Sequence, residues 1–181
     1  QKKLQVTQEY FKPALEVLEF GCGTGSTALT PAFHVKQIRA IDISSEMIKI
    51  AHGKAEAQGI ENITFEQLTI EKLEVEDSTY DAVLGLSILH LLENKESAIA
   101  KVYQMLKPGG IFVTSTMCMG DTMGWFKLIA PIGKALGFFP LVRVFSAQDL
   151  IESLTDAGFE IEYRWQPSKD KAIFIVAKKP E

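Results

Sequence analysis

A glycine-rich turn after an apolar run constrains the fold of this chain more than any other feature. Residues 17–20 read as a β-strand, and glycines follow at alternate positions, Gly21, Gly23 and Gly25. Glycine allows positive φ and leaves no Cβ in the way of a ligand. The polar residues Thr24 and Ser26 then open a helical segment, whose first N–H groups can receive an anionic or hydroxyl-rich ligand. The pattern predicts a strand, a tight turn and a helix start that form a binding site.

Two acidic residues near this turn indicate which cofactor it binds. Gly21, Gly23 and Ser26 alone nearly satisfy the dinucleotide pattern as well. Glu19, however, stands beside the bend, where a carboxylate would repel a pyrophosphate and attract a cationic group. Asp42 ends another apolar run 23 positions later, close to the ~20-residue spacing at which an acid meets a ribose diol. Together they favour a nucleoside cofactor with a positively charged tail.

Four segments in this order resemble the class I S-adenosylmethionine-dependent methyltransferases. Residues 19–25 and 40–44 resemble the family's first two motifs, residues 80–84 its fourth strand, and residues 106–110 the turn before its fifth. The resemblance runs from about Val17 to the C-terminus. It implies a three-layer α/β, Rossmann-like fold with a mostly parallel seven-stranded sheet, in the order 3-2-1-4-5-7-6, that ends in an antiparallel hairpin. It also implies S-adenosylmethionine as cofactor and S-adenosylhomocysteine as product.

The resemblance also implies a role for individual residues. The glycine turn would wrap the methionine portion, Asp42 would accept both ribose hydroxyls, and Ile43 and Met47 would pack on the adenine. The family's usual adenine-reading acid is absent, so the Thr69 hydroxyl and the Ile70 main-chain N–H are expected to serve instead. The predicted cofactor-binding set is Glu19, Gly21, Cys22, Gly23, Gly25, Asp42, Ile43, Met47, Thr69, Ile70, Leu86 and Ser87.

Methyl transfer is a displacement at a carbon that the sulfonium already activates, so no protein nucleophile is required. Alignment of acceptor and methyl group can supply up to roughly 7–11 kcal/mol of the acceleration. No triad and no metal site are therefore expected. His90, one helical turn after Ser87, is the candidate general base for an acceptor hydroxyl or amine. The alternative is that His90 only lines the cofactor cavity.

Composition limits the classes of function. With 181 residues and a net charge of −4, the chain is expected to be one domain, residues 1–181. No lysine or arginine block is present, which argues against a nucleic-acid partner and favours a small-molecule substrate. Cys22 and Cys118 are the only cysteines, and Cys22 lies within the turn, so a cytoplasmic location is expected. The sequence opens on Gln1 and not on Met, so whether residues precede it stays open.

Periodicity predicts the remaining elements. Helices are expected over residues 3–10 and 45–58. The second should be capped at Ser44–Ser45, with Met47, Ile48, Ala51 and Ala55 facing inward. The helix after the glycine turn should be short because Pro31 interrupts it. One later helix should begin after Asn94 and end at residues 108–110. Another should begin after Ser146. Strands are expected near residues 63–65, 80–87, 111–117, 159–165 and 172–177, and Asp81 is read as structural.

Residues 117–145 form an unusually long connection for such a fold, which predicts a lid or substrate-binding insertion. Within it, residues 125–136 favour an amphipathic helix kinked at Pro131. Three explanations stay open: a cap on the core, a wall of an apolar substrate pocket, or a weak interfacial contact with a membrane or partner. A pocket would favour a hydrophobic small molecule.

Two other functions remain as alternatives. The first is a non-catalytic domain that binds the cofactor or regulates a partner and has lost turnover. The second is an NAD(P)-dependent oxidoreductase, which Glu19 disfavours.

Overall fold

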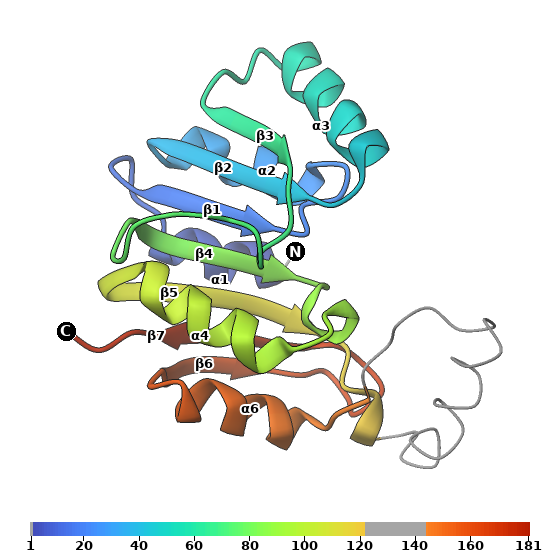
Figure 1. Cartoon of the computed structure of the whole chain (residues 1–181), viewed down its shortest axis with the longest axis vertical. Coiled ribbons are helices and arrows are strands. Elements are labelled where there is room, and N and C mark those ends of the chain that lie inside the picture. The colour runs from blue at the N-terminus through green and yellow to red at the C-terminus, as the bar shows by residue number, and fades with distance from the viewer. Residues whose placement is uncertain (1, 122–143) are drawn as a thin grey trace, which may run out of the picture.

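One seven-stranded sheet forms the centre of the molecule (Figure 1). The computed structural model describes residues 2–121 and 144–181. The strand order is β3-β2-β1-β4-β5-β7-β6, as predicted. Neighbouring strands from β3 to β5 are parallel, and β7 is antiparallel to both β5 and β6. The strands are β1 (Glu16–Phe20), β2 (Gln37–Asp42), β3 (Ile63–Gln67), β4 (Tyr80–Leu86), β5 (Leu106–Thr116), β6 (Glu160–Trp165) and β7 (Ile173–Lys178).

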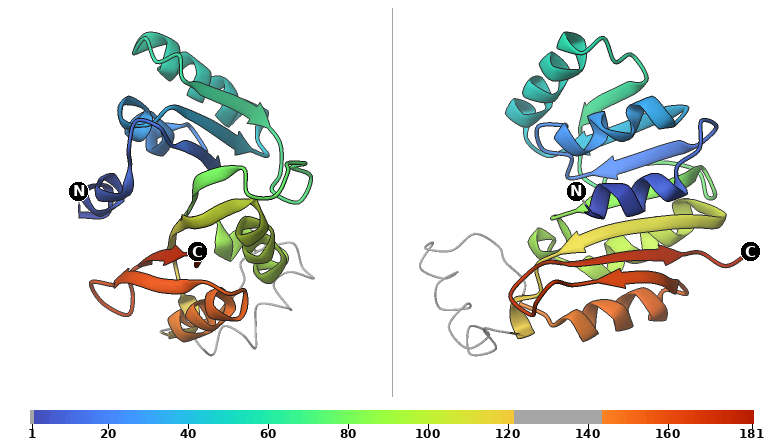
Figure 2. Two further views of the ribbon diagram at one scale, coloured as in Figure 1. Left: turned by 90° about the vertical axis from the view of Figure 1, so that its left-hand side faces the viewer. Right: turned by 180° about the vertical axis from the view of Figure 1, so that it is seen from behind.

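Helices cover both faces of the sheet and complete a three-layer arrangement (Figure 2). The α-helices are α1 (Lys2–Tyr10), α2 (Ser26–Leu29), α3 (Ser45–Ala57), α4 (Lys95–Met105) and α6 (Ala147–Asp156). Short 3-10 helices span Pro31–His34, Leu89–Leu91 and Met119–Asp121. The short α2 agrees with the prediction, since the 3-10 helix that follows it begins at Pro31.

Two apolar cores lie on the two faces of the sheet. On one face, α2 and α3 contribute Ala28, Leu29, Ile48, Ala51 and Ala55, and part of α1 packs beside them. On the other face, residues from α4 and α6 pack against β-strand side chains such as Phe20 and Phe112. Side chains of β1, β4 and β5 alternate between the two cores, as in central parallel strands covered on both faces, whereas the edge strand β3 contributes Ile63 and Phe65 to one core alone.

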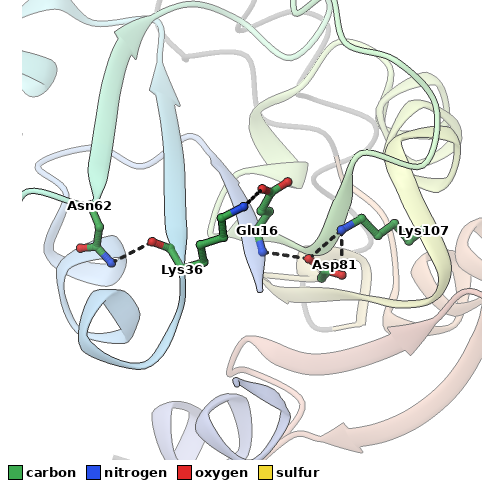
Figure 3. A network of polar contacts seen from close by, with 5 residues as sticks. All are labelled: Glu16, Lys36, Asn62, Asp81 and Lys107. Carbon is green, nitrogen blue, oxygen red and sulfur yellow. Dashed lines mark hydrogen bonds and ion pairs between the residues drawn. The ribbon is translucent and has the colours of Figure 1, made fainter. Parts of the chain in front are cut away.

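Polar contacts fix the N-terminal edge of the sheet (Figure 3). Asp81 accepts a hydrogen bond from the Glu16 main-chain N–H at 2.8 Å and pairs with Lys107 at 3.0 Å. The Glu16 side chain in turn pairs with Lys36 at 2.7 Å. Asp81 therefore joins the starts of β1, β4 and β5 at the edge opposite the predicted site. Its predicted structural role is confirmed.

Side-chain capping sets the helix starts at the predicted residues. Ser44 accepts from the Met47 N–H, Asn94 from the Ser97 N–H, and Ser146 forms a reciprocal capping box with Asp149. The prediction that residues 108–110 end the helix that begins after Asn94 is wrong, because α4 ends at Met105 and β5 begins at Leu106. Pairing of Leu106 with Tyr80 of β4 extends the strand backwards through the proline and glycines.

The predicted inward face of α3 is confirmed for Ile48, Ala51 and Ala55 and is wrong for Met47, which is 39% exposed. Met47 lies in the first turn of α3, close in sequence to the end of β2 at Asp42. The amphipathic helix predicted over residues 125–136, and most of the insertion, lie outside the described residues. In the described part of the chain, no helix combines the length and apolar composition of a membrane span.

Candidate functional site

The glycine turn between β1 and α2 adopts the conformation that the sequence predicts. Gly21, Gly23 and Gly25 have φ values of 67°, 51° and 73°, in the left-handed region that side chains disfavour. A Cβ on Gly21 would lie 2.7 Å from Ile88 Cγ1, and one on Gly25 would lie 2.9 Å from Ala51 Cβ. No heavy atom lies within 4 Å of the place of a Cβ on Gly23. Gly21 and Gly25 are therefore needed for packing, whereas Gly23 faces space that a ligand can occupy.

Asp42 holds this turn against the end of β2. Its Oδ2 accepts the Gly23 N–H at 2.8 Å, and its Oδ1 accepts the Ser44 N–H at 2.9 Å. The Cys22 N–H also donates to the Ile41 carbonyl at 3.1 Å. A carboxylate oxygen can accept more than one hydrogen bond, so ribose hydroxyls can still share Asp42. The sequence predicted only the ribose role and missed the tie to the turn.

Glu19 lies beneath the turn and is almost fully buried, with 1% of its surface exposed. Its Oε1 accepts a hydrogen bond from the Thr27 hydroxyl, while its buried Oε2 has no hydrogen-bond partner. Burial raises the pKa of Glu19 to about 8, and the Thr27 bond offsets only part of this effect. Thr27, eight residues along on α2, is a site residue that the sequence analysis missed. An unpartnered carboxyl oxygen at this position fits a cationic ligand group.

Apolar side chains flank Asp42 on the solvent side. Ile43 is 67% exposed and Met47 is 39% exposed, although both are large and apolar. Ile43 is the next residue after Asp42, and Met47 lies in the first turn of α3. Their exposed surfaces can pack against a flat apolar ring. The exposure of Met47 contradicts its predicted place in the core and agrees with its predicted contact with the adenine ring.

The loop after β3 reaches the same edge through its main chain. The Leu68 N–H donates to the Asp42 carbonyl at 3.0 Å, which places Thr69 next to the site. The Thr69 hydroxyl accepts a 3.4 Å bond from the Lys72 N–H. The Ile70 side chain is buried in the core beneath α4, so only its main chain can face a ligand.

Leu86 and Ser87 stand at the end of β4, beside the turn. Ser87 has a φ of 60°, a strained value for a residue with a Cβ, and its N–H donates to the Ser115 carbonyl at 2.7 Å. Leu86 is half-buried and packs against the core on the α1 and α2 side. The hydrogen bond from Ser87 to Ser115 thus accompanies a departure from regular strand geometry just after β4.

His90 lies in the 3-10 helix Leu89–Leu91 that follows β4. It is half-buried, and its Nδ1 is buried without a hydrogen-bond partner. Burial lowers the pKa of His90, so its imidazole is neutral at pH 7. A neutral imidazole has the protonation state that a general base requires.

Cys22 is buried within the turn, and burial raises the pKa of its thiol to about 12, with the charges of Glu19 and Asp42 adding to the effect. A thiol with such a pKa is protonated and not reactive at neutral pH. Cys22 therefore contributes its main chain to the turn and its side chain to the core.

The strand ends bring these residues to one edge of the sheet. The ends of β1, β2 and β4 lie side by side, and strand order reverses between β1 and β4 (Figure 1). In open α/β sheets, ligands bind at this reversal, outside the C-terminal ends of the strands. The fold is Rossmann-like, and the residues gathered at this edge suit a nucleoside-type ligand.

The chain belongs to the methyltransferase-domain family, whose model matches residues 11–173. A similar curated protein is the ubiquinone biosynthesis O-methyltransferase of Rickettsia prowazekii, 31% identical over 153 residues, which are 82% of this chain and 60% of that protein. The chain spans between 38% and 64% of the length of the curated relatives it matches.

Solved structures share the whole fold at low sequence identity. An S-adenosylmethionine-dependent methyltransferase from Methanosarcina mazei has a TM-score of 0.80, 23% identity and coverage of 97% of both chains. The [4+2]-cyclase SpnF has a TM-score of 0.83 and 21% identity, and covers 99% of this chain and 80% of its own. Since the same fold carries both names, the fold alone does not define the reaction.

Proposed function

We propose that this chain is the catalytic domain of an S-adenosylmethionine-dependent methyltransferase that acts on a small molecule. The observation that carries the proposal is the glycine turn, which Asp42 holds open at Gly23 above the unpartnered Oε2 of Glu19. Family membership and the names of the relatives support methyl transfer. The lack of any basic block supports a small-molecule acceptor over a nucleic acid.

The residues present fit this cofactor. Glu19 would accept a hydrogen bond from its ammonium group, and Asp42 would accept from the ribose hydroxyls with the lone pairs that Gly23 and Ser44 leave. Ile43 and Met47 would cover the adenine ring with their exposed apolar surfaces. Thr69 and the Ile70 main chain would border the ring, and Leu86 and Ser87 the methionine end.

When bound, the cofactor supplies a methyl group on a positively charged sulfur, which an acceptor can displace directly. The chain's own part is to hold the acceptor in line and to exclude water. His90, neutral at pH 7, would take the proton of an acceptor hydroxyl or amine. We propose a hydrophobic acceptor, which the exposed side chains of Leu91 and Met117 near the ends of β4 and β5 support. We place the domain in the cytoplasm, as two buried cysteines without a disulfide suit a reducing compartment.

Calorimetry can test the cofactor through the proton that Glu19 carries. At pH 7 the ligand-free carboxyl is mostly protonated, because its pKa is about 8. An ammonium group against Oε2 would favour the charged form, so S-adenosylhomocysteine should release close to one proton into the buffer. Titrations at pH 7 in buffers of different ionisation enthalpy measure this number. Glu19→Gln is the matched control and should release none.

Titrations with NADH and an assay of methyl transfer separate the two alternative functions. Binding of NADH in place of S-adenosylhomocysteine would favour an oxidoreductase and contradict the proposal. Binding of the cofactor product without methyl transfer from labelled S-adenosylmethionine to any member of a panel of phenols, carboxylates and amines would favour the non-catalytic alternative. Transfer to any of these acceptors establishes the enzyme.

A further inference from the structure

We propose that Lys3 binds an anionic oxygen of the methyl acceptor and so selects acceptors that carry a carboxylate. This inference rests on the proposed function and concerns the same edge of the sheet. It assigns a role to α1, an element in which the sequence analysis found no site residue.

Lys3 lies at the end of α1 that is nearest to the proposed site. In Figure 1 the N-terminus stands beside the tip of β4, and the view from behind in Figure 2 shows α1 lying over β4 and running along it. The Lys3 Nζ donates a 2.6 Å hydrogen bond to Ser115 Oγ, near the end of β5. The Ser115 carbonyl accepts the Ser87 N–H, so Lys3 is linked through one residue to the predicted cofactor contact at Ser87.

The Lys3 ammonium lacks a negative partner in the described part of the chain. Its hydrogen-bond acceptor, Ser115, is neutral, and no carboxylate there lies within ion-pair distance of its Nζ. Residues 122–143 contain neither aspartate nor glutamate, so that part of the chain has no carboxylate side chain to offer. By contrast, Lys36 and Lys107 at the opposite edge of the sheet each pair with a carboxylate. Lys3 is therefore a cation near this edge whose charge an incoming ligand can neutralise; Lys54, which donates to the Thr24 and Ser26 hydroxyls of the glycine turn, lies on the side of the cofactor instead of beside β5.

Partial burial of the Lys3 ammonium increases what it can gain from a bound anion. The Lys3 side chain is partly removed from water, and this burial lowers its pKa. A partly desolvated ammonium gains more from an anion than an exposed one does, because the medium screens the pair less. An ammonium has three donors, so Lys3 can keep its bond to Ser115 while it binds a ligand oxygen.

The surroundings set the rest of the acceptor's chemistry. Leu86 lies opposite Ser115 in the pairing of β4 with β5, and Met117 follows β5 with its side chain exposed. One cation among apolar side chains suits a molecule with an apolar body and a single carboxylate. The acceptor class that we infer is therefore an apolar carboxylic acid that carries the methyl-accepting group.

Benzoate and benzamide are matched probes for this assignment, because they share shape and differ in charge. With the intact protein saturated with S-adenosylhomocysteine, benzoate should bind about tenfold more tightly than benzamide, as one charged hydrogen bond predicts. Lys3→Gln keeps an N–H donor for Ser115 and removes the charge, so it should abolish the preference. Lys3→Arg should retain most of it. Lys12→Gln removes an exposed lysine beyond the other end of α1 and should leave it unchanged.

Three results would overturn the assignment: equal affinity for the two probes, no binding of benzoate, or a preference that survives in Lys3→Gln. Thermal melting of each variant shows whether it is folded. Failure to bind S-adenosylhomocysteine would contradict the proposed function itself. A protein that binds it and shows no preference for benzoate contradicts only the role of Lys3.

Discussion

Replacement of Asp42 by alanine tests the centre of the proposed site. The side chain accepts two main-chain hydrogen bonds, from Gly23 at 2.8 Å and Ser44 at 2.9 Å, and in the proposal it also accepts from the ribose. Hydrogen bonds to a charged group contribute about 1.5–3 kcal/mol. Loss of one such ribose contact should weaken S-adenosylhomocysteine binding by roughly ten- to a hundredfold. Loss of the main-chain bonds should also lower the melting temperature of the ligand-free protein.

A loosened turn and a lost ribose contact would both weaken binding, so the assay must separate them. Adenosine and 2′-deoxyadenosine, compared by NMR titration on wild type and Asp42→Ala, form a thermodynamic cycle. If Asp42 contacts the 2′-hydroxyl, the wild-type protein should prefer adenosine, and the variant should lose that preference. If Asp42 only orders the turn, both ligands should weaken equally. An undiminished preference for adenosine in Asp42→Ala would refute the ribose assignment, whatever the overall loss of affinity.

Three further predictions concern stability, pH and turnover. A Cβ on Gly85 would lie 2.6 Å from Phe20 Cζ, so Gly85→Ala should lower the free energy of unfolding, measured in urea, by about 1–3 kcal/mol. The control is Gly53→Ala in α3, which should be neutral or stabilising because no heavy atom lies within 4 Å of the added Cβ. The folded-state pKa of Glu19, about 8, lies above its ordinary value of 4.5. Stability that is present below pH 4.5 is therefore lost as pH rises towards 8, with a slope of up to about 1.4 kcal/mol per pH unit. Glu19→Gln should flatten this slope in ligand-free protein, and parallel pH profiles for the two proteins would contradict the raised pKa. His90→Ala should lower kcat with little change in S-adenosylhomocysteine affinity, and an equal loss of both would assign His90 to binding.

Local sequence patterns were sufficient for most of the secondary structure. The caps at Ser44, Asn94 and Ser146 were predicted because a side chain bonded to the first turn is a short-range interaction. The short α2 followed from Pro31 for the same reason. The end of α4 was wrong, because pairing of Leu106 with Tyr80 is a contact between distant segments that local patterns do not contain. The strand order came from family resemblance, which the structure and the family model confirm.

The turn with its three glycines, the acids before and after it, and the fold class could be read from the amino-acid order, since each depends on neighbouring residues or on a motif. How those parts meet became known from the folded structure. It tied Asp42 to the Gly23 N–H, buried Glu19 with one oxygen unpartnered, and brought Thr27 against it. It also brought Lys3 into contact with Ser115, more than a hundred residues away in the sequence. These contacts arise from packing α1, α2 and β2 around β1, β4 and β5, and a linear pattern cannot specify which side chains that packing buries or leaves without a partner.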